Sequence, residues 1–167
     1  INSAKTKPFG FQAFYPGPGY GGHCIPIDPF LLSWKARQLN MKTEFIELSG
    51  KINNGLPNKI VKKCLSITKK DKNKKVLIIG AAYKKNVDDM RESPSLAIMQ
   101  GFLKNNVKFE YHDPYIDEIS KLRNYNFKKK SINLTSKNIK KFYITLIVTD
   151  HDVINYNLLL KNSKIII

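Results

Sequence analysis

The residues most suited to chemistry lie in one stretch, FYPGPGYGGHCIPIDP, at positions 14–29. It places the thiol of Cys24 at the end of a loop rich in glycine and proline, and the carboxylate of Asp28 four residues later. A thiolate can add to an aldehyde, the adduct can give up hydride to a cofactor, and water can cleave the resulting thioester. Asp28 follows Cys24 by one helical turn, so we expect it both to orient that water and to cap a helix.

Other roles for Cys24 are weaker. A zinc site fails on ligand count, because His23 and Cys24 have no second ligand pair at the usual spacing, and we expect no metal here. A cysteine hydrolase needs a base, and nothing in the spacing brings His23, His112 or His151 to the thiol. A buried structural cysteine is the third alternative. The glycines at 17, 19, 21 and 22 argue against it, because they make sense if a ligand lies against the backbone.

A helix is expected directly after this loop. Asp28 and Pro29 form a typical helix start, and the segment PFLLSWKARQLN continues the helical pattern to residue 40. Ile27, Leu31 and Trp34 recur at helical spacing, so we expect them to form the buried side of this helix.

A second apolar stripe runs over residues 45–67 at steps of three or four, which predicts a long helix that Pro57 kinks or splits. Cys64 lies on this stripe, so packing rather than chemistry is its expected role. The charged segment KKDKNKK at 69–75 has no periodicity and is the expected linker between two domains.

The rest of the chain alternates strand and helix patterns. Apolar runs at 76–80, 107–111, 144–150 and 164–167 predict strands, and helices are expected over 93–106 and 151–160. Ser93 and Pro94 suit a helix start, with Leu96, Met99 and Leu103 facing inward. This order predicts a doubly wound parallel sheet whose ligands bind beyond the carboxyl ends of the strands, near residues 80–94. The polar, lysine-rich stretch 123–141 is expected to be a surface excursion or a weakly structured insert.

The first turn of this sheet, GAAYKKNVDDMRESP, is not a dinucleotide fingerprint. Only Gly80 is present where the G-x-G-x-x-G pattern needs three glycines. Lys84, Lys85 and Arg91 are placed to hold an anion, and a solvated polar loop is the equally open alternative.

The net charge of +16 raises the alternative of a basic nucleic-acid-binding module. Only three of the 29 basic residues are arginine, and the lysines are scattered over helix faces and loops. A solvated surface is therefore the favoured explanation, and we expect no nucleic-acid partner. No apolar run approaches the roughly 20 residues that cross a bilayer, so a soluble, cytoplasmic protein with reduced thiols is expected.

Two motifs together resemble a known family. GGHCIPIDP and AAYKKNVDDMRESPS are similar to the paired signatures of the UDP-glucose/GDP-mannose dehydrogenase family, whose members are UDP-sugar 6-dehydrogenases. The longer stretch YPGPGYGGHCIPIDPFLLSWKAR most resembles the branch that oxidises UDP-N-acetylhexosamines, the UDP-N-acetylglucosamine 6-dehydrogenases. In the glucose branch, serine and lysine typically stand at the positions of His23 and Ile27.

The resemblance implies roles for individual residues. Cys24 would be the nucleophile that holds the sugar C6 as a thiohemiacetal and then a thioester, with Asp28 assisting hydrolysis. Arg91 would reach NAD, of which two molecules are reduced for each substrate converted from alcohol to carboxylate. The implied contacts to the nucleotide sugar are Phe14, Tyr15, Tyr20, Gly21, Tyr83 and Lys84.

The resemblance also implies an α/β fold and a division of the chain. Residues 1–68 would be the end of a central dimerisation region, and 76–167 a Rossmann-like, UDP-sugar-binding domain. The family's N-terminal NAD-binding domain has no counterpart in the sequence, and the chain stops inside a strand. We therefore expect a C-terminal fragment of a homodimeric enzyme that is inactive alone, with a non-catalytic UDP-sugar-binding or assembly fragment as the alternative.

Overall fold

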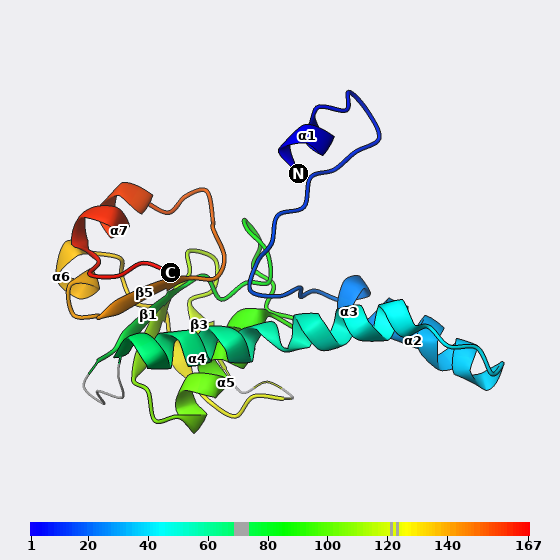
Figure 1. The fold of residues 1–167 in the computed structure, drawn as a ribbon. Coiled ribbons are helices and arrows are strands. Elements are labelled where there is room, and N and C mark those ends of the chain that lie inside the picture. Colours follow the sequence, from blue (N-terminus) through cyan, green and yellow to red (C-terminus); the bar gives the residue numbers. More distant parts are fainter. Residues whose placement is uncertain (69–73, 121, 123) are drawn as a thin grey trace.

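The structure is a computed structural model that describes residues 1–68, 74–120, 122 and 124–167 (Figure 1). Most of the linker expected at 69–75 therefore lies outside the described residues. Three parallel strands form the main sheet in the order β2-β1-β5. Their bounds are Val76–Ile79 for β1, Phe109–His112 for β2 and Ile144–Ile147 for β5.

The central strand β1 is buried on both sides. All four of its side chains are fully buried, and they alternate between two apolar cores. This burial explains why its sequence, VLII, is apolar throughout, as expected for the middle of a parallel sheet. The expected fourth strand is reduced to a single parallel bridge, which joins Ile166 to Thr145 beside β5.

Helices cover both faces of the sheet. On one face, α4 (Leu56–Thr68) and α5 (Pro94–Lys104) pack against each other and bury the larger core. On the other face lie α6 (Ser136–Ile139) and α7 (Tyr156–Asn162), with a smaller core beneath them (Figure 1). Parallel strands between two helical layers are the Rossmann-like arrangement that the sequence predicted.

Helix α5 begins as expected. The Ser93 hydroxyl accepts a hydrogen bond from the Ser95 N–H at 3.2 Å, and Pro94 occupies the first helical position. Leu96 and Met99 are buried, but Leu103 is 40% exposed, so its expected inward orientation is wrong. Phe102, one position earlier, is fully buried in its place.

The expectation of a surface excursion over residues 123–141 is wrong in part. This stretch contains β4 (Lys129–Lys130), which pairs antiparallel with β3 (Glu118–Ile119), and the whole of α6. Ile139 in α6 is fully buried against the sheet. The high lysine content hid the few apolar positions that the core uses.

Helix α2 (Cys24–Gln38) starts earlier than the sequence predicted. Its N-cap is His23, whose side chain makes no capping hydrogen bond. The expected cap at Asp28 is therefore wrong, because Asp28 and Pro29 lie inside the helix. The helix ends near the expected Asn40, which adopts a left-handed conformation at φ 56°.

The expected buried side of α2 is also wrong. Ile27, Leu31 and Trp34 are 36%, 58% and 59% exposed, and Ser33 is the buried residue of the helix. α2 packs on α3 (Glu44–Asn54) through an adjacent side, where Gly50 leaves room for the Phe30 ring. The apolar spacing identified the helix correctly but not the side that its described neighbours cover.

The long stripe at 45–67 forms two helices, as expected. α3 ends at Asn54 and α4 begins at Leu56, with Pro57 in its first turn, so the helix is split next to that proline. α3 and α4 run nearly end to end and carry α2 away from the sheet (Figure 1). Cys64 is 1% exposed in the core, as expected for a packing residue.

The N-terminal segment extends away from the rest of the chain and ends in the short helix α1 (Asn2–Lys5) (Figure 1). In the part of the chain that the structure describes, we find no helix with the length and apolarity needed to span a bilayer.

The packing of α7 gives a paired prediction. Leu159→Ala should lower the free energy of unfolding by about 3 kcal/mol, because this side chain is 1% exposed and its loss leaves a cavity. Leu160→Ala, at the next position and 68% exposed, should change it by less than about 0.5 kcal/mol. Urea denaturation of the two variants measures the difference, and equal losses would contradict the two-layer core.

Candidate functional site

A cavity of about 380 Å³ lies at the carboxyl-terminal edge of the sheet. One wall is the extended segment that carries Phe14 and Tyr15, and the other is the loop after β1 that carries Tyr83 and Lys84. Residues 148–150, which follow β5, close the third side. The structure therefore brings together four of the residues that the sequence singled out for substrate binding, from segments about 70 positions apart.

The three basic residues near this edge differ in how they are paired. The Lys85 ammonium lies 2.9 Å from an Asp152 oxygen, and this hydrogen bond, with the carboxylate charge, raises the pKa of Lys85. Lys84 makes no ion pair with any described residue, and its ammonium lies 5.7 Å from the centre of the Tyr83 ring. Among the lysines lining the cavity, Lys84 is therefore the one available to an anion.

Arg91 is held by a neighbouring carboxylate. Its guanidinium donates to both oxygens of Asp89, with the shortest contact, from Nη2, at 2.7 Å. These hydrogen bonds lower the pKa of Asp89 and raise that of Arg91, and the nearby Cys24 sulfur adds slightly to the latter shift. Asp89 therefore fixes the direction of an exposed guanidinium close to the thiol.

The thiol of Cys24 is exposed at the first residue of α2. Asp28 is also exposed and follows one turn later on the same helix, so both groups face one side. The first turn of a helix favours negative charge, which suits a thiolate. Cys24 does not line the cavity at the sheet edge, and the structure does not bring it together with Phe14 and Lys84.

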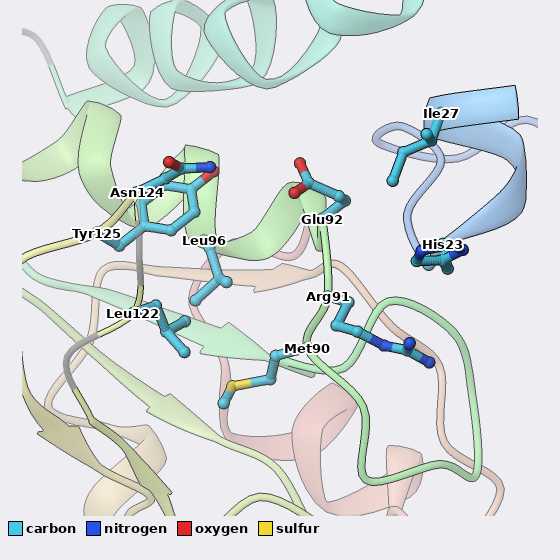
Figure 2. A pocket seen from close by; sticks show the side chains of 10 residues that line it. His23, Ile27, Met90, Arg91, Glu92, Leu96, Leu122, Asn124 and Tyr125 are labelled. Atoms are coloured by element: carbon cyan, nitrogen blue, oxygen red, sulfur yellow. The ribbon is translucent and has the colours of Figure 1, made fainter. Parts of the chain in front are cut away.

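A second cavity, also of about 380 Å³, lies beside the thiol-bearing turn (Figure 2). Its polar rim includes His23, Arg91 and Glu92, next to Ile27 on α2. The apolar side chains of Met90, Leu96, Leu122 and Tyr125 form its opposite wall. The described residues offer a mainly apolar surface with one arginine, Arg91, at its edge.

The glycines before Cys24 allow the loop after β1 to pack closely against their backbone. A Cβ at Gly21 would lie 2.6 Å from the Tyr83 Cβ and 2.8 Å from the Glu92 carbonyl oxygen. One at Gly22 would lie 2.9 Å from the Tyr83 ring, and the Gly22 N–H donates to the Arg91 carbonyl at 2.8 Å. The glycine pattern predicts close approach of a ligand, whereas in the structure Gly21 and Gly22 let the thiol-bearing turn dock on the loop after β1.

Tyr20 is anchored by a residue that the sequence analysis missed. Its N–H donates to Oδ1 of Asn53 at 2.9 Å, and partial burial raises the pKa of its hydroxyl. It lines a small cavity of about 110 Å³ with Asn53 and Ser93, apart from the cavity at the sheet edge. The 33 positions between Tyr20 and Asn53 left no local signal for this contact.

Comparison with known proteins identifies two family models. Residues 77–167 match the UDP-binding domain of the UDP-glucose/GDP-mannose dehydrogenase family, and residues 1–55 match the central domain of the same family.

Individual relatives have related names. A UDP-N-acetyl-D-mannosamine dehydrogenase of Methanococcus vannielii is 33% identical over 86% of this chain and 37% of its own length. A UDP-N-acetyl-D-glucosamine 6-dehydrogenase of Pseudomonas aeruginosa is 27% identical over 75% of this chain and 30% of its own. The solved UDP-D-ManNAc dehydrogenase of Pyrococcus horikoshii superposes with a TM-score of 0.71 at 25% identity, over 98% of this chain and 37% of that one.

The docking of the glycine turn can be tested with matched substitutions. Gly22→Ala should lower the free energy of unfolding by about 2 kcal/mol, because a methyl group would meet the Tyr83 ring at a backbone φ of +88°. Gly17→Ala should change it by no more than about 0.5 kcal/mol, since nothing lies within 4 Å of a Cβ there. Chemical denaturation measures both, and a harmless Gly22→Ala would disprove the close contact.

Proposed function

The chain belongs to the UDP-glucose/GDP-mannose dehydrogenase family, and we propose that it supplies the thiol and the nucleotide-binding part of a UDP-N-acetylhexosamine 6-dehydrogenase. It spans 37% of the length of the Methanococcus vannielii relative, so the proposed activity is that of a larger protein. We propose that the chain alone is inactive. The observation that carries the proposal is the cavity that joins Phe14 and Tyr15 to Tyr83 and Lys84.

The sheet-edge cavity fits the nucleotide part of such a substrate. Lys84 offers a positive charge to a diphosphate, while the charge of Lys85 is already compensated by Asp152. The exposed rings of Phe14 and Tyr15 offer apolar surface on the opposite wall. Among the described residues that line this cavity, one lysine without an ion pair lies between aromatic surfaces, which suits a nucleoside diphosphate better than a long polyanion. This supports the UDP-sugar proposal over the nucleic-acid alternative.

The residues around the thiol fit NAD as the cofactor. Arg91 is exposed and lies at the edge of the mainly apolar cavity beside α2. Asp89 engages its Nε and Nη2 and offsets its charge, so Arg91 would bind an anionic part of the cofactor through the remaining N–H groups of its guanidinium. NAD, when bound, supplies the hydride acceptor for both oxidation steps. Most of its binding residues belong, in this proposal, to a part of the enzyme outside this chain.

Cys24 and Asp28 have different roles in the proposed covalent mechanism. The Cys24 sulfur adds to the C6 aldehyde and forms a thiohemiacetal, and loss of hydride from C6 leaves a thioester. Asp28, one turn along α2, takes a proton from water as its oxygen attacks that thioester. Cleavage of the carbon–sulfur bond then releases the C6 carboxylate and restores the thiol.

We further propose that the enzyme acts as a homodimer in the cytoplasm. Both cysteines are free thiols, which suits a reducing compartment. Leu31, Trp34 and Phe45 on α2 and α3 are 58%, 59% and 82% exposed, and exposed apolar side chains on two helices that pack together support burial in an assembly.

The role of the thiol is tested in the complete enzyme. Cys24→Ser should lower the rate of net oxidation on the order of a thousandfold or more, because no thioester can form, while UDP binding is retained. The control Cys64→Ala should lower stability but keep activity, since Cys64 is buried in the core. The wild type should form two NADH for each UDP-N-acetylhexosamine molecule that it oxidises, with the N-acetylgluco, N-acetylgalacto or N-acetylmanno epimer as the substrate. Undiminished oxidation by Cys24→Ser would refute the mechanism.

The nucleotide site is tested by calorimetry of UDP binding to the same enzyme. Lys84→Gln should raise the Kd about tenfold, the effect of losing one charged hydrogen bond. Lys137→Gln, an equal loss of charge on α6, should leave it unchanged. Salt-sensitive binding to duplex DNA with no response to UDP would favour the nucleic-acid alternative instead.

A further inference from the structure

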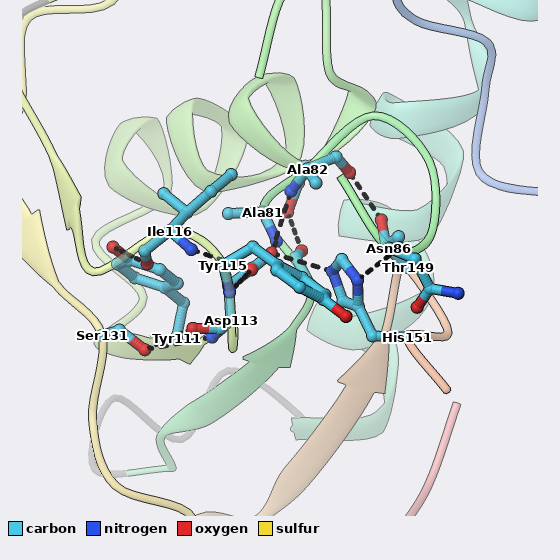
Figure 3. A network of polar contacts seen from close by, with 12 residues as sticks. Ala81, Ala82, Asn86, Tyr111, Asp113, Tyr115, Ile116, Ser131, Thr149 and His151 are labelled. Atoms are coloured by element: carbon cyan, nitrogen blue, oxygen red, sulfur yellow. Dashed lines mark hydrogen bonds and ion pairs between the residues drawn. The ribbon is translucent and has the colours of Figure 1, made fainter. Parts of the chain in front are cut away.

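Asp113 is a buried carboxylate outside the site described so far (Figure 3). It directly follows β2, its side chain is fully buried, and its two oxygens accept five hydrogen bonds. The donors are the backbone N–H groups of Ala81 at 2.6 Å, Ala82 at 3.0 Å, Tyr115 at 2.8 Å and Ile116 at 3.1 Å, and Nε2 of His151 at 3.0 Å. A carboxylate this deep is tolerated only because its oxygens are so fully satisfied.

His151 is the partner of Asp113 and is equally buried. Its Nδ1 lies 2.9 Å from the backbone nitrogen of Asn86, which can only donate, so Nδ1 is the acceptor in this contact. Nε2 must then carry the proton that is given to Asp113, which fixes a single neutral tautomer. The Tyr115 ring packs beside the imidazole with 5.1 Å between ring centres.

Together the two residues join the loops that follow all three strands. Asp113 comes after β2 and His151 after β5, and both bind the loop after β1. Within that loop, the segment 81–86 (the 81–86 loop) is held at its start through Ala81 and Ala82, and at its end through Asn86.

A second contact reinforces the far end of the loop. The Asn86 side-chain amide donates to Asp152 at 2.6 Å and accepts from the Asp152 N–H at 3.0 Å. Asn86 itself has a left-handed backbone at φ 62°. Tyr83 and Lys84 lie between the two anchored ends, at the wall of the sheet-edge cavity. Their placement therefore depends on side chains that do not line that cavity.

We propose that Asp113 and His151 are positioning residues for the nucleotide-sugar site, which they act on through the 81–86 loop. The inference rests on the function proposed above. Burial of an ionised carboxylate is costly even with a neutral imidazole as partner, so the pair adds little net stability compared with apolar side chains of the same size. A fully satisfied polar network does, however, hold a loop in one conformation, and a binding site gains affinity when its contacts are already in place.

The test uses His151→Leu and His151→Gln in the complete enzyme. Leucine removes both hydrogen bonds of the ring, whereas glutamine retains a donor for Asp113 and should partly rescue. The KM for the UDP-sugar should rise about tenfold in His151→Leu and less in His151→Gln, with kcat within about twofold of the wild type, since Cys24 is untouched. Hydrogen exchange should show lost protection at the amides of Ala81, Ala82 and Asn86.

Tyr111→Phe is the matched control. It removes another buried hydrogen bond, which runs from the hydroxyl of Tyr111 on β2 to the Ile116 carbonyl at 3.1 Å. This hydrogen bond does not contact the 81–86 loop. It should lower the melting temperature and leave KM unchanged. If His151→Leu also lowers only the melting temperature, the positioning role is overturned. If the wild type oxidises no UDP-N-acetylhexosamine and does not bind UDP, the proposed function fails instead, a result visible before any variant is compared.

Discussion

The rest of the site depends on one close contact between backbones, in which the Gly22 N–H donates to the carbonyl of Arg91 and the glycine turn lies against Tyr83. No side chain fits at Gly21 or Gly22, so the contact can form only with glycine there. It fixes the start of α2, and with it Cys24, against the loop that lines the sheet-edge cavity. Cys24 and Lys84, which are more than 50 positions apart in sequence, are thereby carried by two segments that pack on each other.

The charges around these two segments are largely compensated within the protein. Asp152 pairs with Lys85 and Asp89 with Arg91, while Asp113 is satisfied by amides and an imidazole. Among the described residues Lys84 forms no ion pair, although its charge adds to that of Arg91 in lowering the pKa of Asp89. A net charge of +16 says little about the site, because the local pairing decides which cation a ligand meets.

Local sequence signals predicted the local structure. The apolar run VLII gave the central strand, Ser93 and Pro94 gave the start of α5, and the spacing around Cys64 gave a buried helix face. These local signals failed to predict burial and side-chain contacts where the residue or helix that makes the contact lies far away in the sequence. Nothing near Asp113 or His151 shows that they meet 38 positions apart, and Leu31 looks buried by spacing although no described element covers it. Helix periodicity reports an apolar side, whereas burial depends on which neighbour is present.

The nearly collinear helices α3 and α4 have a mechanical consequence (Figure 1). One end of this rod packs on α2 and the other on α5, the helix that begins at the end of the loop after β1. A tilt of the rod would therefore act on Cys24, at the start of α2, and on the sheet-edge cavity together.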